Sequence, residues 1–81
     1  MSKNNLKSDK ILDQRGRLCP MPIITANNEI ASLSKGQILE VICDDPGSQS
    51  DFEAWTKSRG HNIVSSSNTS NTFRFLIKKG E

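Results

Sequence analysis

The stretch L-D-Q-R-G-R-L-C-P-M-P runs from Leu12 to Pro22 and places a cysteine between a glycine-containing turn and two prolines. Proline suits the first turn of a helix, because its φ is already near the helical value and the N–H that it lacks would have no partner there. We therefore place the first helical residue at Pro20 and the N-cap at Cys19. The stretch predicts a short strand, a turn around Gly16 and then a helix.

Cys19 is the candidate nucleophile. A thiol at a helix N-terminus lies beside the positive end of the helix dipole, where it ionises more easily, and the thiolate is the reactive form. Two of the first four N–H groups are missing here because of the prolines, so we expect only a moderate lowering of the cysteine pKa. Such a pKa, near ambient pH, suits sulfur exchange. The residues expected to support this loop are Arg15, Gly16, Arg17, Pro20, Met21 and Pro22, with the two arginines close enough in sequence to add positive potential. A Cys-Pro step also occurs in ordinary unreactive loops, and that alternative stays open.

Composition narrows the class of protein. The chain has 81 residues, 33% of them hydrophobic, and a net charge of +2, which is too small to point to nucleic acid. We expect a flexible tail over residues 1–9 and a single domain over residues 10–79. Two cysteines are too few for a disulfide scaffold, and no zinc-like spacing, signal peptide or membrane span is recognisable. These features predict a cytoplasmic protein that needs no metal or cofactor.

The first half of the chain continues as a helix and a strand. Ile23, Ala26, Ile30 and Leu33 recur at spacings of three and four, which predicts one apolar helix face, and Gly36 is expected to end the helix. Residues 37–43 read Q-I-L-E-V-I-C, a short apolar strand with both faces largely covered. Cys43 at its end is interpreted as a small buried hydrophobe.

The second half opens with turn chemistry. Asp44 and Asp45 could suggest a metal or acid–base site, but no histidine or third carboxylate is near, so a solvated or capping loop is the preferred interpretation. A second helix is expected over residues 49–59, capped by Ser48 or Ser50, with Phe52 and Trp55 in the core and Gly60 as its stop. His61 is interpreted as structural or merely exposed.

Two strands are expected to close the chain as a hairpin. Residues 62–65 form the first, residues 65–71 (S-S-S-N-T-S-N) a polar loop, and the alternation from Phe73 to Lys78 the second. The order is thus β-α-β-α-β-β. Right-handed crossovers put both helices on one face of the sheet. The predicted fold is α/β (α+β), a two-layer sandwich with a mixed four-stranded sheet, whose other face is polar or binds something.

These motifs together resemble the TusA-type sulfur-carrier family, also called SirA-like. The resemblance rests on L-D-x-R-G-x-x-C-P-x-P at Leu12 to Pro22, D-D-P-G-S at Asp44 to Ser48, D-F-x-x-W at Asp51 to Trp55, G-H at Gly60 and His61, and F-x-F-x-I-x-K at Phe73 to Lys79. It implies the β-α-β-α-β-β sandwich and a persulfide relay on Cys19. The implied partners are a persulfide donor, such as a cysteine desulfurase or a rhodanese-like protein, and a sulfur-acceptor protein. The implied outputs are tRNA thiolation, cofactor synthesis or dissimilatory sulfur metabolism.

Two features qualify the comparison. Arg17 occupies a variable position of the signature and could tune the choice of partner, and Cys43 lies outside the signature. The competing hypotheses are an RNA- or protein-binding regulatory module and a redox sensor built on Cys19. Against nucleic-acid binding, no aromatic pair stands on the central strand and the charge is weak. We expect a monomer, with no membrane and no direct nucleic-acid partner.

Overall fold

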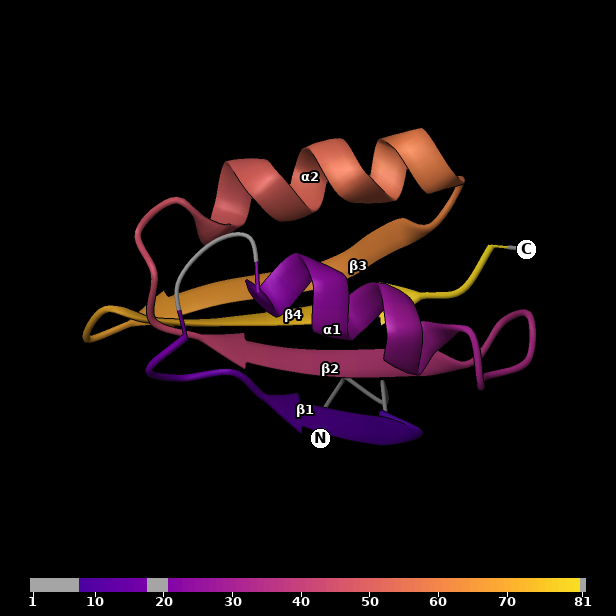
Figure 1. The fold of residues 1–81 in the computed structure, drawn as a ribbon, viewed down its shortest axis with the longest axis horizontal. Helices are drawn as coiled ribbons and strands as arrows, with labels where there is room; N and C mark the ends of the chain where they lie inside the picture. Colours follow the sequence, from indigo (N-terminus) through magenta and orange to yellow (C-terminus); the bar gives the residue numbers. More distant parts are fainter. Residues whose placement is uncertain (1–7, 18–20, 81) are drawn as a thin grey trace, which may run out of the picture.

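The computed structural model describes residues 8–17 and 21–80. The elements in this part of the chain are β1 (Lys10–Asp13), α1 (Met21–Ile30), β2 (Ile38–Cys43), α2 (Ser48–Arg59), β3 (Asn62–Thr69) and β4 (Thr72–Lys78) (Figure 1). The predicted order is therefore confirmed. Of the tail expected over residues 1–9, the structure describes only Ser8 and Asp9, and both are hydrogen-bonded to β2.

The four strands form one sheet in the order β1-β2-β4-β3. β1 pairs with β2 in parallel, and β4 pairs with both β2 and β3 in antiparallel orientation. The sheet is mixed, as predicted, because a helical crossover makes the β1–β2 pair parallel and a tight turn makes the β3–β4 pair antiparallel.

The core lies between the helices and one face of the sheet. Alternate residues of a strand share a face, so Leu39, Val41 and Cys43 of β2 point to the same side as Phe75 and Ile77 of β4. All five are buried in one cluster with side chains from both helices, namely Ala26, Ile30, Phe52 and Trp55. Both helices consequently cover the same face, and the α+β two-layer sandwich is confirmed.

On the opposite face of the sheet, residues 8–17 and 21–80 place no helix. Its centre is an ion pair between Glu40 of β2 and Arg74 of β4, and the Ser8 hydroxyl donates to the same glutamate. Glu40 is buried by these neighbours, whereas Ile11 of β1 is 61% exposed. The prediction that both faces of β2 are largely covered holds in this limited sense, since side chains rather than a layer cover the second face.

Three local predictions need correction. α1 ends at Ile30 rather than near Gly36, because the Ser32 amide and hydroxyl both donate to the Glu29 carbonyl and tighten the last turn. The N-cap of α2 is Gly47, with no side-chain cap from either serine.

The segment expected as a polar loop over residues 65–71 is mostly strand. β3 continues to Thr69, and only Ser70 and Asn71, both at positive φ, form the turn. A two-residue turn with positive φ at both positions matches the twist of a hairpin, and pairing with β4 outweighs the low strand propensity of serine and asparagine.

The other features of α2 follow the sequence. Phe52 and Trp55 are buried, and Gly60 ends the helix in the left-handed conformation. His61 contacts the Trp55 ring, and its Nδ1 accepts a hydrogen bond from the Gly80 N–H at 3.0 Å. None of the helices in the described ranges is long and apolar enough to cross a membrane.

The buried face of β4 allows a stability test. Ile77 is fully buried, so Ile77→Val should lower the free energy of unfolding by about 0.5–1.5 kcal/mol through lost packing. Ile11→Val removes the same methylene from an exposed site and should change it by less than about 0.5 kcal/mol. Chemical denaturation of both variants checks this; equal losses would contradict the placement of the core.

Candidate functional site

In the sequence, the predicted cysteine falls between β1 and α1, in residues 14–20, and we call this segment the β1–α1 loop. Because β1 and β2 are parallel and adjacent, this loop starts beside the loop that leaves β2 at Asp44. The Gln14 N–H donates to the Ile42 carbonyl at 2.7 Å and extends the strand ladder by one residue. Ligand sites in open α/β sheets gather at the carboxyl ends of such strands. The site is therefore a pair of neighbouring loops at one edge of the sheet.

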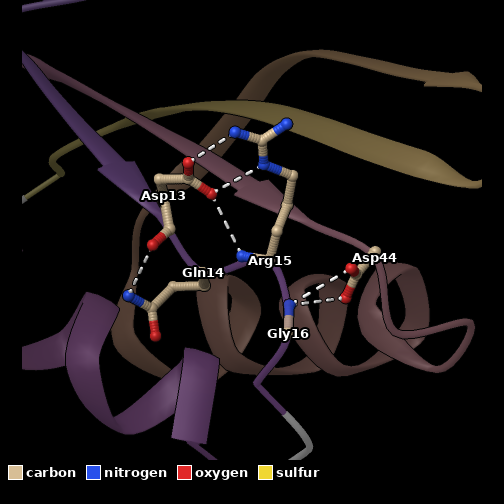
Figure 2. Close-up of polar contacts among 5 residues, drawn as sticks. All are labelled: Asp13, Gln14, Arg15, Gly16 and Asp44. Atoms are coloured by element: carbon tan, nitrogen blue, oxygen red, sulfur yellow. Dashed lines mark hydrogen bonds and ion pairs between the residues drawn. The ribbon is translucent and has the colours of Figure 1, made fainter.

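Arg15 is held by Asp13, the last residue of β1. Its guanidinium Nε and Nη2 donate to the two carboxylate oxygens at 2.9 and 2.7 Å, and its backbone N–H donates to the same carboxylate at 3.1 Å (Figure 2). These hydrogen bonds lower the pKa of Asp13 to about 2 and raise the pKa of Arg15. The positive charge expected from Arg15 is thus largely matched by Asp13.

Gly16 is held from the neighbouring loop. Its N–H points between the two carboxylate oxygens of Asp44, at 3.0 and 3.1 Å (Figure 2). Gly16 has a φ of +83°, which places this turn in the left-handed region where glycine is favoured. The glycine of the sequence signature therefore turns the chain and also presents its amide to Asp44.

Gln14 lies beneath the loop and was not singled out by the sequence. Its side chain is only 5% exposed, and its amide nitrogen donates to the Asp13 carbonyl at 3.2 Å. Its Oε1 is buried without a hydrogen-bond partner in the described part of the chain. Gln14 anchors the start of the loop to the sheet through its backbone N–H, and its side chain is buried.

The remaining predicted site residues are only partly described by the structure. Cys19, which is also the proposed N-cap, and Pro20 lie outside the described residues. Arg17 is exposed, with its N–H donated to the Gln14 carbonyl at 3.2 Å. On the other side, Met21 opens α1 and is 41% exposed, whereas Pro22 is buried.

Cys43 lies at the carboxyl end of β2, fully buried in the core. Burial raises the pKa of its thiol to about 11, chiefly because the core disfavours the charged form. The interpretation of Cys43 as a small buried hydrophobe is confirmed.

A shallow groove runs between the two helices. It has a volume of about 200 Å³ and is lined by Ile23, Ile24, Asn27, Asn28, Trp55 and Arg59. Trp55 is fixed at its floor by donating Nε1–H to the Asn27 side chain at 3.2 Å. Ile24 lines the groove and is exposed, and Met21, one helical turn before it, is exposed as well. Met21 is the first described residue after Cys19, so the exposed apolar side chains of α1 begin there.

The paired aspartates have separate tasks. Asp44 binds the β1–α1 loop, and Asp45 accepts the Gly47 N–H at 3.1 Å in the turn before α2. In the described ranges no three acidic, histidine or cysteine side chains come together as a metal ion would require. The preference for a loop-capping role over a metal site agrees with these contacts.

Known proteins resemble this chain in sequence and in fold. Residues 10–79 match the family named Sulfurtransferase TusA. The chain belongs to the TusA family. It is 44% identical to the sulfur carrier protein TusA of Allochromatium vinosum over 71 residues, covering 88% of this chain and 93% of that one. It is 43% identical to YrkI of Bacillus subtilis over 75 residues, covering 93% and 100%.

A solved structure has the same fold. The crystal structure of the SirA-like protein from Desulfitobacterium hafniense superposes with a TM-score of 0.78, covering 89% of this chain and 99% of that chain at 23% identity. The TusA-type resemblance seen in the sequence is confirmed, and so is the fold that it implied.

Within this TusA chain, sequence reasoning missed the partners of the loop. The L-D-x-R-G and D-D-P motifs were recognised, but nothing in their spacing says that Asp13 binds Arg15 or that Asp44 binds Gly16. The parallel β1–β2 register explains the Asp44–Gly16 contact, because it aligns Asp13 with Ile42, two residues before Asp44.

The Asp13–Arg15 pair should be visible in an acid titration. The folded pKa of Asp13, about 2, lies below its ordinary value of 3.8. The pair therefore contributes stability above pH 4 and loses it as the pH falls from about 4 to 2. Carboxyl-carbon NMR should report the low pKa in the wild type and a higher pKa in Arg15→Gln, which loses the guanidinium but keeps the backbone N–H bond to Asp13. An unchanged pKa in that variant would contradict the pairing.

Cys43 should resist alkylation in the native protein. With a pKa of about 11, only about one thiol in a thousand is ionised at pH 8, and the side chain is also fully buried. Peptide mass spectrometry after iodoacetamide treatment should find Cys43 unmodified in the folded Cys19→Ser variant and modified in urea. Rapid labelling of the folded variant would contradict its burial.

Proposed function

We propose that this chain is a sulfur carrier that accepts a sulfane sulfur on Cys19 as a persulfide and relays it to an acceptor protein. One observation carries the proposal: the chain matches the TusA sulfurtransferase family over a span that contains the C-P-x-P cysteine. The anchored residues 14–17 before that cysteine and the start of α1 after it are consistent with a cysteine presented at the edge of the sheet.

The transfer needs no external oxidant. The Cys19 thiolate attacks the outer sulfur of a donor persulfide, a new S–S bond forms, and the old S–S bond breaks. The electron pair leaves with the donor cysteine, which becomes a thiolate, and the sulfane sulfur stays on Cys19 as a persulfide. An acceptor thiolate repeats the same step on that outer sulfur. The sulfane oxidation level moves from one cysteine to the next, so the electrons balance.

The chain favours a persistent persulfide over a disulfide. A second thiol close to Cys19 would attack the persulfide and close a disulfide. In a C-x-x-C motif that thiol would stand at the position of Pro22. The other cysteine, Cys43, is buried with a raised pKa and is a poor competitor. A redox sensor, which relies on a stable oxidised state, is less well served by this arrangement.

The partners follow from the chemistry. We propose a persulfide donor, such as a cysteine desulfurase or a rhodanese-like protein, and a sulfur-accepting protein in tRNA thiolation, cofactor synthesis or dissimilatory sulfur metabolism. Both must reach Cys19, and Met21 and Ile24 offer exposed apolar contacts in the first turn of the helix that follows it in the chain. A monomer in the cytoplasm, with residues 10–79 as the working domain, meets these needs.

An RNA-binding role has less support. Single-stranded RNA is commonly bound by aromatic side chains on an open sheet face. Here the three phenylalanines and the one tryptophan all belong to the core or pack against it, on the side that the helices cover. The open face offers a Glu40–Arg74 ion pair in place of a stacking platform.

Intact-mass spectrometry after incubation with glutathione persulfide tests the carrier. The wild type should gain one sulfur atom that dithiothreitol removes, Cys43→Ser should gain it too, and Cys19→Ser should gain none. Cys43→Ser is the matched control because it removes the other thiol. Loading that persists in Cys19→Ser would contradict the assignment of the site, and no loading of the wild type while its Cys19 thiol is free would contradict the carrier function.

A further inference from the structure

Asp44 makes a contact that the carrier function alone does not require. Its carboxylate accepts the Gly16 N–H across 28 positions of sequence (Figure 2). In the described part of the β1–α1 loop, two hydrogen bonds reach β2 or the segment after it. The other one, from the Gln14 N–H to the Ile42 carbonyl, continues the backbone ladder. Asp44 is therefore the side chain that ties the turn of this loop to the neighbouring loop.

The remaining contacts of the loop are local. Arg15 is bound by Asp13 two residues earlier, and the Arg17 N–H returns to the Gln14 carbonyl. Such contacts fix the shape of the turn, but they leave its position over the sheet to Gln14 and Gly16. Cys19 comes three positions after Gly16, at most about 11 Å along an extended chain. A movement of the turn would accordingly move the cysteine.

The charge of Asp44 is unfavourable for a nucleophilic cysteine. A nearby carboxylate disfavours the thiolate and raises the thiol pKa. Asp44 would therefore not activate the cysteine electrostatically. Its two carboxylate oxygens both accept the Gly16 N–H, so its role is to anchor the backbone of the loop. A charged acceptor also makes the stronger hydrogen bond.

We propose that Asp44 is a positioning residue, which holds Gly16 so that Cys19 is presented to the donor persulfide in a reactive place. The proposal rests on the proposed carrier function, and it assigns to the first aspartate of D-D-P-G-S a task in sulfur transfer. Asp44 acts through the loop backbone and does not touch the transferred sulfur. Because a misplacement of about 1 Å can slow a reaction by orders of magnitude, loss of the anchor should be readily measurable.

Two substitutions of Asp44 distinguish the effect of its hydrogen bond to Gly16 from the effect of its negative charge. Asp44→Asn keeps a side-chain oxygen that can accept the Gly16 N–H, and Asp44→Ala removes it; both remove the negative charge. Any difference between them therefore reports the hydrogen bond. With glutathione persulfide as donor, Asp44→Asn should load Cys19 at about the wild-type rate or faster. Asp44→Ala should load about ten-fold or more slowly than Asp44→Asn.

Asp9 supplies a matched control. Its carboxylate accepts the Ile38 N–H at 2.8 Å, so it is also a carboxylate that accepts a backbone N–H, but at the opposite ends of β1 and β2. Asp9→Ala should lose stability in thermal unfolding as Asp44→Ala does, yet keep the wild-type loading rate. Equal loading rates for Asp44→Ala and Asp44→Asn, or an equally slow Asp9→Ala, would overturn the proposal.

A second readout does not depend on sulfur chemistry. In nitrogen-15 NMR spectra, the Gly16 amide proton should keep its hydrogen-bonded shift in Asp44→Asn and lose it in Asp44→Ala, and the Cys19 amide signal should shift with it. A wild type that fails to load with this coupling intact would overturn the carrier function and leave the anchor standing. Normal loading of Asp44→Ala would overturn the positioning role alone.

Discussion

The parallel pairing of β1 with β2 is the constraint on which the site depends. It brings the loop that carries the cysteine beside the loop that begins at Asp44, although the two are about thirty residues apart in the chain. The pairing is possible because α1 returns the chain across the sheet and buries Ala26 and Ile30 against β2. A strand of four residues, β1, has few hydrogen bonds of its own, so its register also relies on the backbone bonds at Asp9 and Gln14 that extend the ladder at either end.

The charged side chains around the cysteine loop each bind a separate neighbour and do not form one charged cluster. The sequence places two arginines before Cys19 and two aspartates after β2, which invites a picture of a positive site opposite a negative one. In the structure Arg15 forms an ion pair with Asp13, and Asp44 accepts the Gly16 N–H. Asp45 accepts the Gly47 N–H in the turn before α2. Arg17 remains exposed on the loop. These charged residues therefore fix the backbone of the loop more than they create a strong positive electrostatic potential.

Much of the fold could be predicted from the sequence because its signals are local. Apolar spacing placed both helices, Gly60 marked the end of α2, and alternation from Phe73 marked β4. The largest error arose where a tertiary contact overrides propensity: residues 65–69 become strand because β4 pairs with them. Of the candidate site, the loop and its glycine could be predicted from motifs, but the roles of Asp13, Gln14 and Asp44 could not, because they depend on strand register and burial.

The composition of β3 has a consequence for the molecule in a crowded solution. β3 is an eight-residue strand at the edge of the sheet, and no strand of the described residues pairs with its outer side (Figure 1). Long edge strands are templates for aggregation through intermolecular β-pairing. Here the edge is mostly serine, asparagine and threonine, and its register shifts between Ile63 and Ser65. A polar edge with a register shift is a poor template for a second strand. The serines and asparagines that made this segment resemble a loop in the sequence therefore also disfavour intermolecular β-pairing at β3.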